Sequence, residues 1–455
     1  MKVAKFGGSS LASAPQVQKV CAIIADDPAR KIVVVSAPGK RDKGDTKVTD
    51  LLIAAAQARL QGASGATEIA RVIQRYDDIA AALGLPAAAT ATIADNLHQC
   101  LAHDTTHPGV YLDTLKAAGE DNSARLVTAY LNHLGLPAVY VNPREGGMVL
   151  SDEPGNARVL EESYARLATL AQRDEIVVFP GFFGYAPTGN VVTFPRGGSD
   201  ITGAILARAV QADLYENFTD VDSVYVANPA VVQHPVAVQV MTYREMRELA
   251  YAGFSVFHEE ALEPVFQAGI PVAIKNTNNP AAPGTRLVTS REVTNDPIVG
   301  IAASDGFCMV YISKYMMNRE VGFGRRVLQI FEEAGIPFEH MPSGIDNISV
   351  IVRESLFTPA VEARVLAQIR ETLVPDDASV ERGLGLVMLV GEGMRHTVGL
   401  AARACTAYHR AGINLEMINQ GSSEVSMMFG IATADIPAAV RALYQEFFTA
   451  DSASM

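Results

Sequence analysis

Apolar runs of strand length alternate with amphipathic stretches along the first 290 residues of the chain. The apolar runs are rich in Val and Ile, which is typical of strands buried on both faces of a sheet. They cover residues 2–6, 31–36, 138–142, 176–180, 190–194, 214–218 and 271–275. Between them, apolar residues at three- and four-residue spacing predict helices at residues 15–25, 50–61, 122–134, 160–172 and 200–210.

This alternation predicts a mostly parallel sheet with helices packed on both faces, and therefore an α/β domain over residues 1–290. Residues 54–99 are rich in Ala and contain almost no strand-like run. We interpret this segment as a helical excursion from the sheet.

An internal repeat follows residue 300. Gly322 and Ser349 recur 77 positions later as Gly399 and Ser426, and an Ala-Gly-Ile triplet recurs at the same offset. A repeat that keeps its register through a loop, a helix and a strand indicates a duplicated small domain. Each copy has the ferredoxin-like βαββαβ pattern, and the two copies are expected at residues 305–380 and 386–449.

Composition narrows the classes of function. The chain has 455 residues and a formal net charge of −13 without a basic run, so we expect no nucleic-acid partner. Its apolar runs are too short to span a bilayer and no secretory signal segment opens the chain, so we expect no membrane association. The four cysteines lie far apart, which indicates reduced thiols in a cytoplasmic protein.

Candidate chemistry gathers where the expected strands end, which is where parallel sheets bind their ligands. At the first strand end, Lys5 is followed by Gly7, Gly8, Ser9 and Ser10. Backbone N–H groups without neighbouring side chains, together with one ammonium group, can hold a phosphate. Further clusters of Gly, Ser, Arg and Asp occupy residues 36–39, 181–184, 195–200 and 217–222. Such clusters at several strand ends indicate one shared ligand site.

Together these segments resemble the aspartate kinases of the amino-acid-kinase superfamily, over essentially the whole chain. The motifs are K-F-G-G-S-S at residues 5–10, V-T-D-L-L at 48–52, G-E-D-N-S at 119–123, R-G-G-S-D at 196–200 and T-D-V-D at 219–222. M-I-N-Q-G-S-S-E at residues 417–424 resembles the paired ACT domains that follow these kinases. The resemblance implies a three-layer amino-acid-kinase-like sandwich followed by two ferredoxin-like ACT domains, the second completed by a strand at residues 298–304.

The resemblance also implies a reaction, in which ATP carrying Mg²⁺ phosphorylates L-aspartate to 4-phospho-L-aspartate. It assigns catalytic roles to Lys5, Arg196 and Asp200. It assigns nucleotide binding to Lys5, Phe6, Gly7, Gly8, Ser9, Thr219, Asp220 and Tyr225. It assigns substrate binding to Ser36, Thr49, Glu120, Arg196, Gly197, Gly198 and Ser199. No metal ligand from the protein itself is expected.

The residue types suit these roles. The side chain of aspartate has a free pKa of about 3.9 and is ionised at neutral pH, so its phosphorylation needs no general base. Arg196 is expected to hold a substrate carboxylate through two parallel hydrogen bonds, and Glu120 to bind the substrate ammonium. Asp200 is expected to orient Lys5 or the magnesium-bound nucleotide, although an N-cap role alone would also explain it.

The sequence departs from the family at two basic positions near the nucleotide. Many members have Asp-Pro-Arg shortly after T-D-V-D, whereas this chain has Asn228, Pro229 and Ala230. Many also have a lysine in G-A-K-V-L-H-P, where this chain has Ser255. The preference for ATP over GTP therefore stays open.

Tandem βαββαβ units of this kind commonly bind an amino acid where paired domains meet. The resemblance places effector contacts at Met317, Gly322, Phe323, Ser343, Asp346, Asn419 and Gln420. Asp346 can supply a carboxylate for the effector ammonium, and the backbone near Gly344 can supply N–H groups for its carboxylate. We predict feedback inhibition by lysine, in preference to threonine, in a homodimer or homotetramer.

The sequence therefore predicts a monofunctional aspartate kinase for the first step of lysine, threonine and methionine biosynthesis, because a chain of this length has no room for the dehydrogenase fused to some relatives. Two alternatives stay open. The first is a kinase for another acidic substrate, such as an N-acetylated glutamate, against which Glu120 and the tandem repeat argue. The second is a catalytically inactive amino-acid sensor, which Ala230 and Ser255 would explain.

Overall fold

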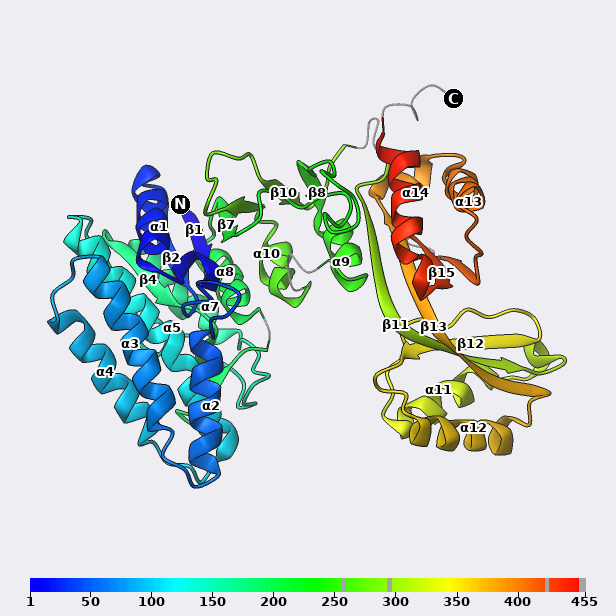
Figure 1. The fold of residues 1–455 in the computed structure, drawn as a ribbon, viewed down its shortest axis with the longest axis horizontal. Coiled ribbons are helices and arrows are strands. Elements are labelled where there is room, and N and C mark those ends of the chain that lie inside the picture. Colours follow the sequence, from blue (N-terminus) through cyan, green and yellow to red (C-terminus); the bar gives the residue numbers. More distant parts are fainter. Residues whose placement is uncertain (196, 255–258, 293–296, 422–424, 450–455) are drawn as a thin grey trace. The chain divides into compact units, whose positions relative to one another are not determined.

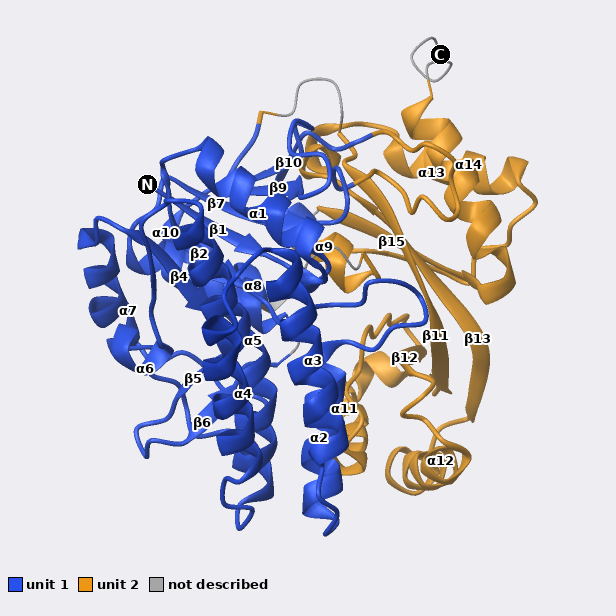
Figure 2. Cartoon of the chain, turned by 60° about the vertical axis from the view of Figure 1, so that its left-hand side comes forward, with its two compact units in different colours: residues 1–224, 237–246, 255–291 blue, residues 225–236, 247–254, 292–455 orange. Residues whose placement is uncertain are grey.

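The computed structural model describes residues 1–195, 197–254, 259–292, 297–421 and 425–449. The chain forms two compact units (Figure 2). Unit 1 contains residues 1–224, 237–246 and 255–291, and unit 2 contains residues 225–236, 247–254 and 292–455. Within the ranges described, no helix is long and apolar enough to cross a membrane.

An eight-stranded sheet forms the centre of unit 1 (Figure 1). Neighbouring strands are parallel except for β9 and β10, so the predicted mostly parallel sheet is confirmed. The strand order is β3 (Ala138–Tyr140), β4 (Ile176–Pro180), β2 (Arg30–Val35), β1 (Lys2–Phe6), β7 (Leu214–Thr219), β9 (Val272–Asn276), β10 (Thr285–Val288) and β8 (Val240–Thr242).

Helices cover both faces of this sheet. α1 (Ala14–Asp26) and α5 (Pro108–His133) connect strands in one direction along the sheet, whereas α8 (Gly198–Ala209) connects strands in the other direction. Because parallel connections are right-handed, the two sets lie on opposite faces and complete the predicted three layers. α7 (Glu162–Leu167) and α10 (Glu263–Ala268) pack against α8.

The segment interpreted as a helical excursion forms three helices that pack on one another and on α5. They are α2 (Val48–Leu60), α3 (Ala66–Ala82) and α4 (Ala88–Leu101). Their apolar faces meet α5 in an apolar core of unit 1, where Tyr76, Leu115 and Leu131 are fully buried. Two further short helices of the chain are α6 (Pro143–Gly146) and α9 (Tyr243–Tyr251).

Three expected elements of unit 1 differ from the structure. The strand expected at residues 190–194 is β6 (Val191–Thr193), which pairs only with β5 (Phe183–Tyr185) in a separate hairpin. The helix expected at residues 122–134 begins earlier, at Pro108, where the proline suits a first helical turn. The helix expected at residues 160–172 tightens into a 3₁₀ turn, η2 (Ala168–Gln172), after α7.

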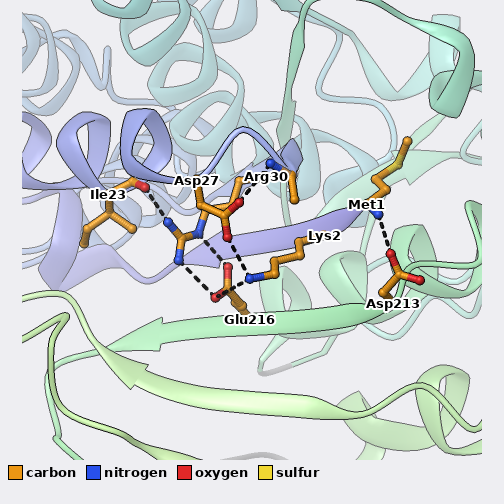
Figure 3. Close-up of polar contacts among 8 residues, drawn as sticks. Met1, Lys2, Ile23, Asp27, Arg30, Asp213 and Glu216 are labelled. Carbon is orange, nitrogen blue, oxygen red and sulfur yellow. Dashed lines mark hydrogen bonds and ion pairs between the residues drawn. The ribbon is translucent and has the colours of Figure 1, made fainter.

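Ion pairs close the amino end of β1 (Figure 3). Arg30 donates two hydrogen bonds to Glu216 at 2.6 and 3.1 Å, and a third to the carbonyl oxygen of Ile23. Lys2 donates to Asp27 at 2.7 Å. Since β2 and β7 flank β1, these contacts join three neighbouring strands at the end of the sheet away from the candidate chemistry.

Unit 2 contains a five-stranded antiparallel sheet. Its order is β12 (Asn347–Arg353), β11 (Gly300–Ser313), β13 (Asp377–Val390), β15 (Ser426–Ala432) and β14 (Met417–Gln420). β11 and β13 are long strands that run through both repeats. Residues 300–304 of β11 pair with residues 386–390 of β13, the part of β13 that opens the second repeat.

Each repeat of unit 2 has its own apolar core. The first core lies under α11 (Phe323–Ala334) and α12 (Pro359–Leu373), and the second under α13 (Leu400–Arg410) and α14 (Ile436–Phe448). Gly322 and Gly399 precede α11 and α13 with φ of 79° and 90°, and Gly335 and Gly412 follow them with φ of 71° and 69°. The same left-handed glycines at corresponding positions confirm that the small domain is duplicated.

Candidate active site

Lys5 lies in the middle of the main sheet, near the carboxyl end of β1. Its neighbours on β2 and β7 are Val34 and Asn217. The lysine side chain is buried, and its ammonium nitrogen lies 2.5 Å from Oδ1 of Asp200. The structure thus brings together two of the three residues predicted to be catalytic.

Asp200 lies in the first turn of α8, not at the N-cap that the sequence suggests. The N-cap is Gly197, whose φ of 76° is left-handed, and no side chain caps the helix. A carboxylate in the first turn is stabilised by the partial positive charge of the helix N-terminus. Asp200 therefore lies beside Lys5 without a capping role.

Asn217 is a member of the site to which the sequence analysis assigned no role. Its side-chain amide donates to Oδ1 of Asp200 at 2.7 Å, so that this oxygen receives both Asn217 and Lys5. The signal in the sequence was a pair of polar residues, Glu216 and Asn217, inside an expected strand, at the start of the strand-end cluster at residues 217–222. Its meaning depends on the register of β1 with β7, which pairs Lys5 with Asn217 across more than two hundred residues.

Two glycine turns meet beside Lys5. The N–H of Gly39 donates to the carbonyl oxygen of Gly8 at 2.8 Å. A Cβ atom on Gly8 would lie 2.9 Å from the carbonyl oxygen of Ala37, and one on Gly39 would lie 2.7 Å from the backbone of Gly8. Only glycine at both positions allows this backbone contact, so the turn after β1 and the turn after β2 form one surface.

The N–H groups at this surface are not equally available to a phosphate. Gly7 donates its N–H to the carbonyl oxygen of Phe218 at 3.2 Å. Gly8 and Ser9, which open the 3₁₀ turn η1 (Gly8–Leu11), have N–H groups without an acceptor in the described part of the chain. Phe6 is fully buried and stacks on Phe218, so its side chain faces the core.

Glu120 is a carboxyl group buried inside a helix. It lies within α5, is 5% exposed, and has an Oε2 atom without a hydrogen-bond partner among the described residues. Burial raises its pKa to about 8, although the neighbouring backbone of Ala37 acts in the opposite direction. A buried acid of this kind requires a cation to ionise at neutral pH.

The other predicted substrate residues follow neighbouring strands or begin helices. Ser36 follows β2, and Thr49 lies in the first turn of α2. Ser199 is buried in the first turn of α8, where its side chain contacts the backbone of Gly181 after β4. The structure therefore gathers Ser36, Gly181 and Ser199 around the carboxyl ends of adjacent strands.

Arg196 lies outside the described residues. Next to it, Gly198 is packed so tightly that a Cβ atom would lie 2.5 Å from the ring of Phe182. Phe182 itself has a φ of 75°, which is rare for a bulky residue, and its N–H is bonded to Thr202 at 3.0 Å. Backbone strain of this kind is often found at functional sites, and no pattern in the sequence indicated it.

The predicted nucleotide residues divide between the two units. Thr219 ends β7, and its hydroxyl lies 3.2 Å from the side chain of Asp220. Asp222 accepts hydrogen bonds from Asn276 at the end of β9 and from Asn279 in the loop that follows. Tyr225 belongs to unit 2, so its nucleotide contact stays a prediction.

The predicted effector residues lie in unit 2. Met317 and Phe323 are buried in the first apolar core, and Gly322 precedes α11. Oδ1 of Asp346 accepts the N–H of Met316 at 2.8 Å. Ser343 forms a bridge with the start of β12, and the two polar residues expected in the second repeat lie on β14 at the sheet edge, Asn419 and Gln420.

Comparisons with known proteins agree with this arrangement. The amino acid kinase family model matches residues 1–276, and an ACT domain model matches residues 387–447. Aspartokinase 3 of Bacillus subtilis is 57% identical to this chain, over 98% of this chain and 99% of that protein. Chloroplastic aspartokinase 1 of Arabidopsis thaliana is 30% identical, over 98% of this chain and 80% of that protein.

Solved structures give the same picture. The aspartate kinase of Clostridium acetobutylicum matches with a TM-score of 0.88 at 36% identity, over 98% of this chain and all of that one. Escherichia coli aspartokinase III, in complex with aspartate and ADP, shares the fold with a TM-score of 0.77 at 24% identity, over 99% of this chain and all of that one. The fold and the family model define the class as an amino acid kinase with ACT domains. Within that class, the chain belongs to the aspartokinases.

Proposed function

We propose that this chain transfers the γ-phosphoryl group of ATP to the side-chain carboxylate of L-aspartate. The observation that carries the proposal is the pairing of Lys5 with Asp200 beside the N–H groups of Gly8 and Ser9. An ammonium and two backbone donors can neutralise the charge that develops on the transferring phosphoryl oxygens. Phosphoryl transfer to a carboxylate that is already ionised then needs positioning more than proton transfer.

Glu120 supports an amino acid as the acceptor. Its buried Oε2 atom would gain a partner from the ammonium group of the substrate, which would also hold the carboxyl group in its ionised form. Ser36, Thr49 and Ser199 would complete the pocket, and Arg196 would bind the α-carboxylate. An N-acetylated substrate has no ammonium, so Glu120 argues against that alternative.

A magnesium ion would enter the site with the nucleotide. Among the residues that the structure describes, no group of three or more His, Cys, Asp or Glu could hold a metal ion. Both side-chain contacts that Asp200 makes with described residues use Oδ1, so Oδ2 could face a magnesium-bound nucleotide. Mg²⁺ binds through few carboxylates and several phosphate oxygens, and it would neutralise phosphate charge there. The residues present therefore fit a nucleotide-borne ion.

One assay separates the alternatives. Aspartate, ATP and magnesium are incubated with the full chain and hydroxylamine, which traps an acyl phosphate as a hydroxamate. The proposal expects hydroxamate from aspartate and no product from N-acetylglutamate. Replacing ATP by GTP in the same assay measures the nucleotide preference. No product from any acidic substrate would instead favour the inactive sensor.

We further propose feedback inhibition by an amino acid, with lysine favoured over threonine, in a homodimer or homotetramer. The Clostridium relative is described as an allosteric enzyme. Unit 2 exposes large apolar side chains, among them Val321, Ile345 and Val398, and contact with a second copy would remove such side chains from water. Light scattering at micromolar concentration tests the proposed assembly. A monomeric mass would contradict it. The cytoplasmic location stays a prediction.

A further inference from the structure

One loop joins the two halves of the proposed site. Residues 36–47 connect β2 to α2, and we call them the β2–α2 loop. Ser36 begins this loop, Ala37 packs against Gly119, the residue before Glu120, and Gly39 donates its N–H to the carbonyl oxygen of Gly8. The loop closes on itself where the N–H of Val48 donates to the carbonyl oxygen of Pro38 at 3.1 Å. Its position therefore sets both the phosphate-binding turn and the pocket around Glu120.

Arg75 holds this loop from outside the site. It lies on α3, within the helical excursion, and is 4% exposed. Nη1 donates to the carbonyl oxygen of Gly39 at 3.1 Å, and Nη2 lies 2.7 and 2.6 Å from the two carboxylate oxygens of Asp45. Nη2 also lies 3.4 Å from the carbonyl oxygen of Thr46. One guanidinium thus reaches both ends of the loop.

These contacts suit arginine and not lysine. A planar guanidinium has donors fixed in direction, so it can bond a carbonyl and a carboxylate at the same time. A lysine ammonium is a point charge on a flexible stem and would keep the attraction to Asp45 without fixing Gly39. The other partner of Asp45, Arg41, lies at the surface and approaches it at 3.0 Å.

We propose that Arg75 is a positioning residue for both substrates of the proposed kinase, although its contacts are with the loop alone. The inference rests on the proposed function. By holding Gly39 against Gly8, Arg75 sets the N–H groups that would receive the phosphates. Through the same loop it sets Ala37 against Glu120, and hence the binding point of the substrate ammonium. A shift of about 1 Å in such a loop can cost about a hundredfold in rate.

The chain offers a matched control in Arg30. Like Arg75, it is buried and binds both oxygens of one carboxylate and a backbone carbonyl. Its contacts, however, lie at the amino end of the sheet (Figure 3). Arg75→Lys and Arg30→Lys therefore remove similar hydrogen bonds from opposite ends of the same unit.

The test measures kcat and the KM values for ATP and aspartate by the hydroxamate assay, with thermal unfolding of each full-length variant. We expect Arg75→Lys to raise both KM values by about tenfold or more, because a displaced loop misplaces the groups that would bind both substrates. We expect Arg30→Lys to lower the unfolding temperature while leaving both KM values within about twofold of the wild type.

Each outcome decides one question. Unchanged KM values in Arg75→Lys would overturn the positioning role, as would an equal rise in Arg30→Lys, because both variants would then report only lost stability. Should Arg75→Lys fail to fold, Asp45→Asn weakens the same contact from the partly exposed side, and unchanged KM values there would be equally decisive. A wild type that forms no hydroxamate would contradict the proposed function itself.

Discussion

At the scale of single residues, the proposed reaction depends most on Lys5 and Asp200. Lys5→Ala is expected to lower kcat by about 100- to 1,000-fold, because it removes a fixed charge that faces the transferring phosphoryl group. Lys2→Ala, on the same strand, provides the control, since Lys2 bonds Asp27 at the far end of the sheet. Steady-state kinetics measures kcat for both variants. Equal kcat values for Lys5→Ala and Lys2→Ala would show that Lys5 has no special part in the reaction.

Glu120 gives a prediction that depends on pH. Its pKa is about 8 in the folded chain against 4.5 for the ordinary group, so folding favours the protonated form. Between these values the unfolded state is ionised and the folded state is not, so this group lowers the free energy of unfolding as pH rises. Glu120→Gln removes the effect, and its stability relative to the wild type should increase from pH 5 to pH 8.

The measurement is thermal or chemical unfolding of wild type and Glu120→Gln at several pH values without ligand. A constant difference between the two proteins would contradict the raised pKa. Aspartate provides a second readout, because its ammonium requires the ionised carboxylate. Its affinity for the wild type should rise between pH 6 and pH 8, the window below the raised pKa, and this rise should be absent from the glutamine variant.

The sequence identified most candidate residues but not the reasons for their states. Lys5, Asp200 and Glu120 were predicted as site residues because each belongs to one of the short motifs that resemble the aspartate kinases. Asn217 received no role because its contact depends on the register of distant strands. The helix predicted at residues 122–134 would have left Glu120 outside it, whereas α5 begins well before Glu120 and buries it in mid-helix.

At the scale of elements, the contact between the two glycine turns determines the geometry of the phosphate site. Gly39→Ala would place a Cβ atom 2.7 Å from the backbone of Gly8, and this crowding should cost about 1–3 kcal/mol of stability. We also expect a rise in the KM for ATP, since the clash moves Gly8. Gly44→Ala is the control in the same loop, because its Cβ would meet only a side-chain oxygen at 3.4 Å.

Denaturant unfolding and ATP kinetics on the two glycine variants check this prediction. Equal effects of Gly39→Ala and Gly44→Ala would mean that the loop tolerates neither side chain, and the contact between turns would lose its importance. The sequence shows that glycines follow both of these expected strands. It could not show that the two turns touch, because a backbone contact between β1 and β2 ends leaves no pattern in either segment.

Elements with a strong local pattern were predicted best. The buried strands and the helices of the excursion follow from their apolar spacing. β6 was expected beside the main sheet because an apolar run of three or four residues carries no information about its partner. Its actual position is fixed by Asp113 of α5, which accepts the N–H groups of Thr193 and Gly155 at 2.7 Å.

At the scale of the whole molecule, the duplicated domain was visible in the sequence through its period. The two long strands β11 and β13 then join the copies into one sheet, so neither repeat has a complete set of strands of its own. A ligand that moves one repeat therefore acts on strands that both share. This continuity favours inhibition that involves unit 2 as a whole.

The loop before α11 provides the test of regulation. Oδ1 of Asp346 accepts the N–H of Met316 at 2.8 Å, and a carboxylate oxygen of Asp376 accepts the N–H of Tyr315 at 2.6 Å. The two aspartates thus hold neighbouring residues of one loop in the same manner. Only Asp346 belongs to the predicted effector contacts.

Asp346→Asn keeps an oxygen that can accept the same N–H but removes the charge that would bind an effector ammonium. We expect the lysine concentration for half-maximal inhibition to rise about tenfold or more, as for a lost hydrogen bond between charged groups. Uninhibited activity should not change, and Asp376→Asn should respond to lysine as the wild type does. Inhibition curves with lysine and threonine on the full chain check this. Equal loss of inhibition in both variants would show that the loop conformation matters and that Asp346 does not bind the effector.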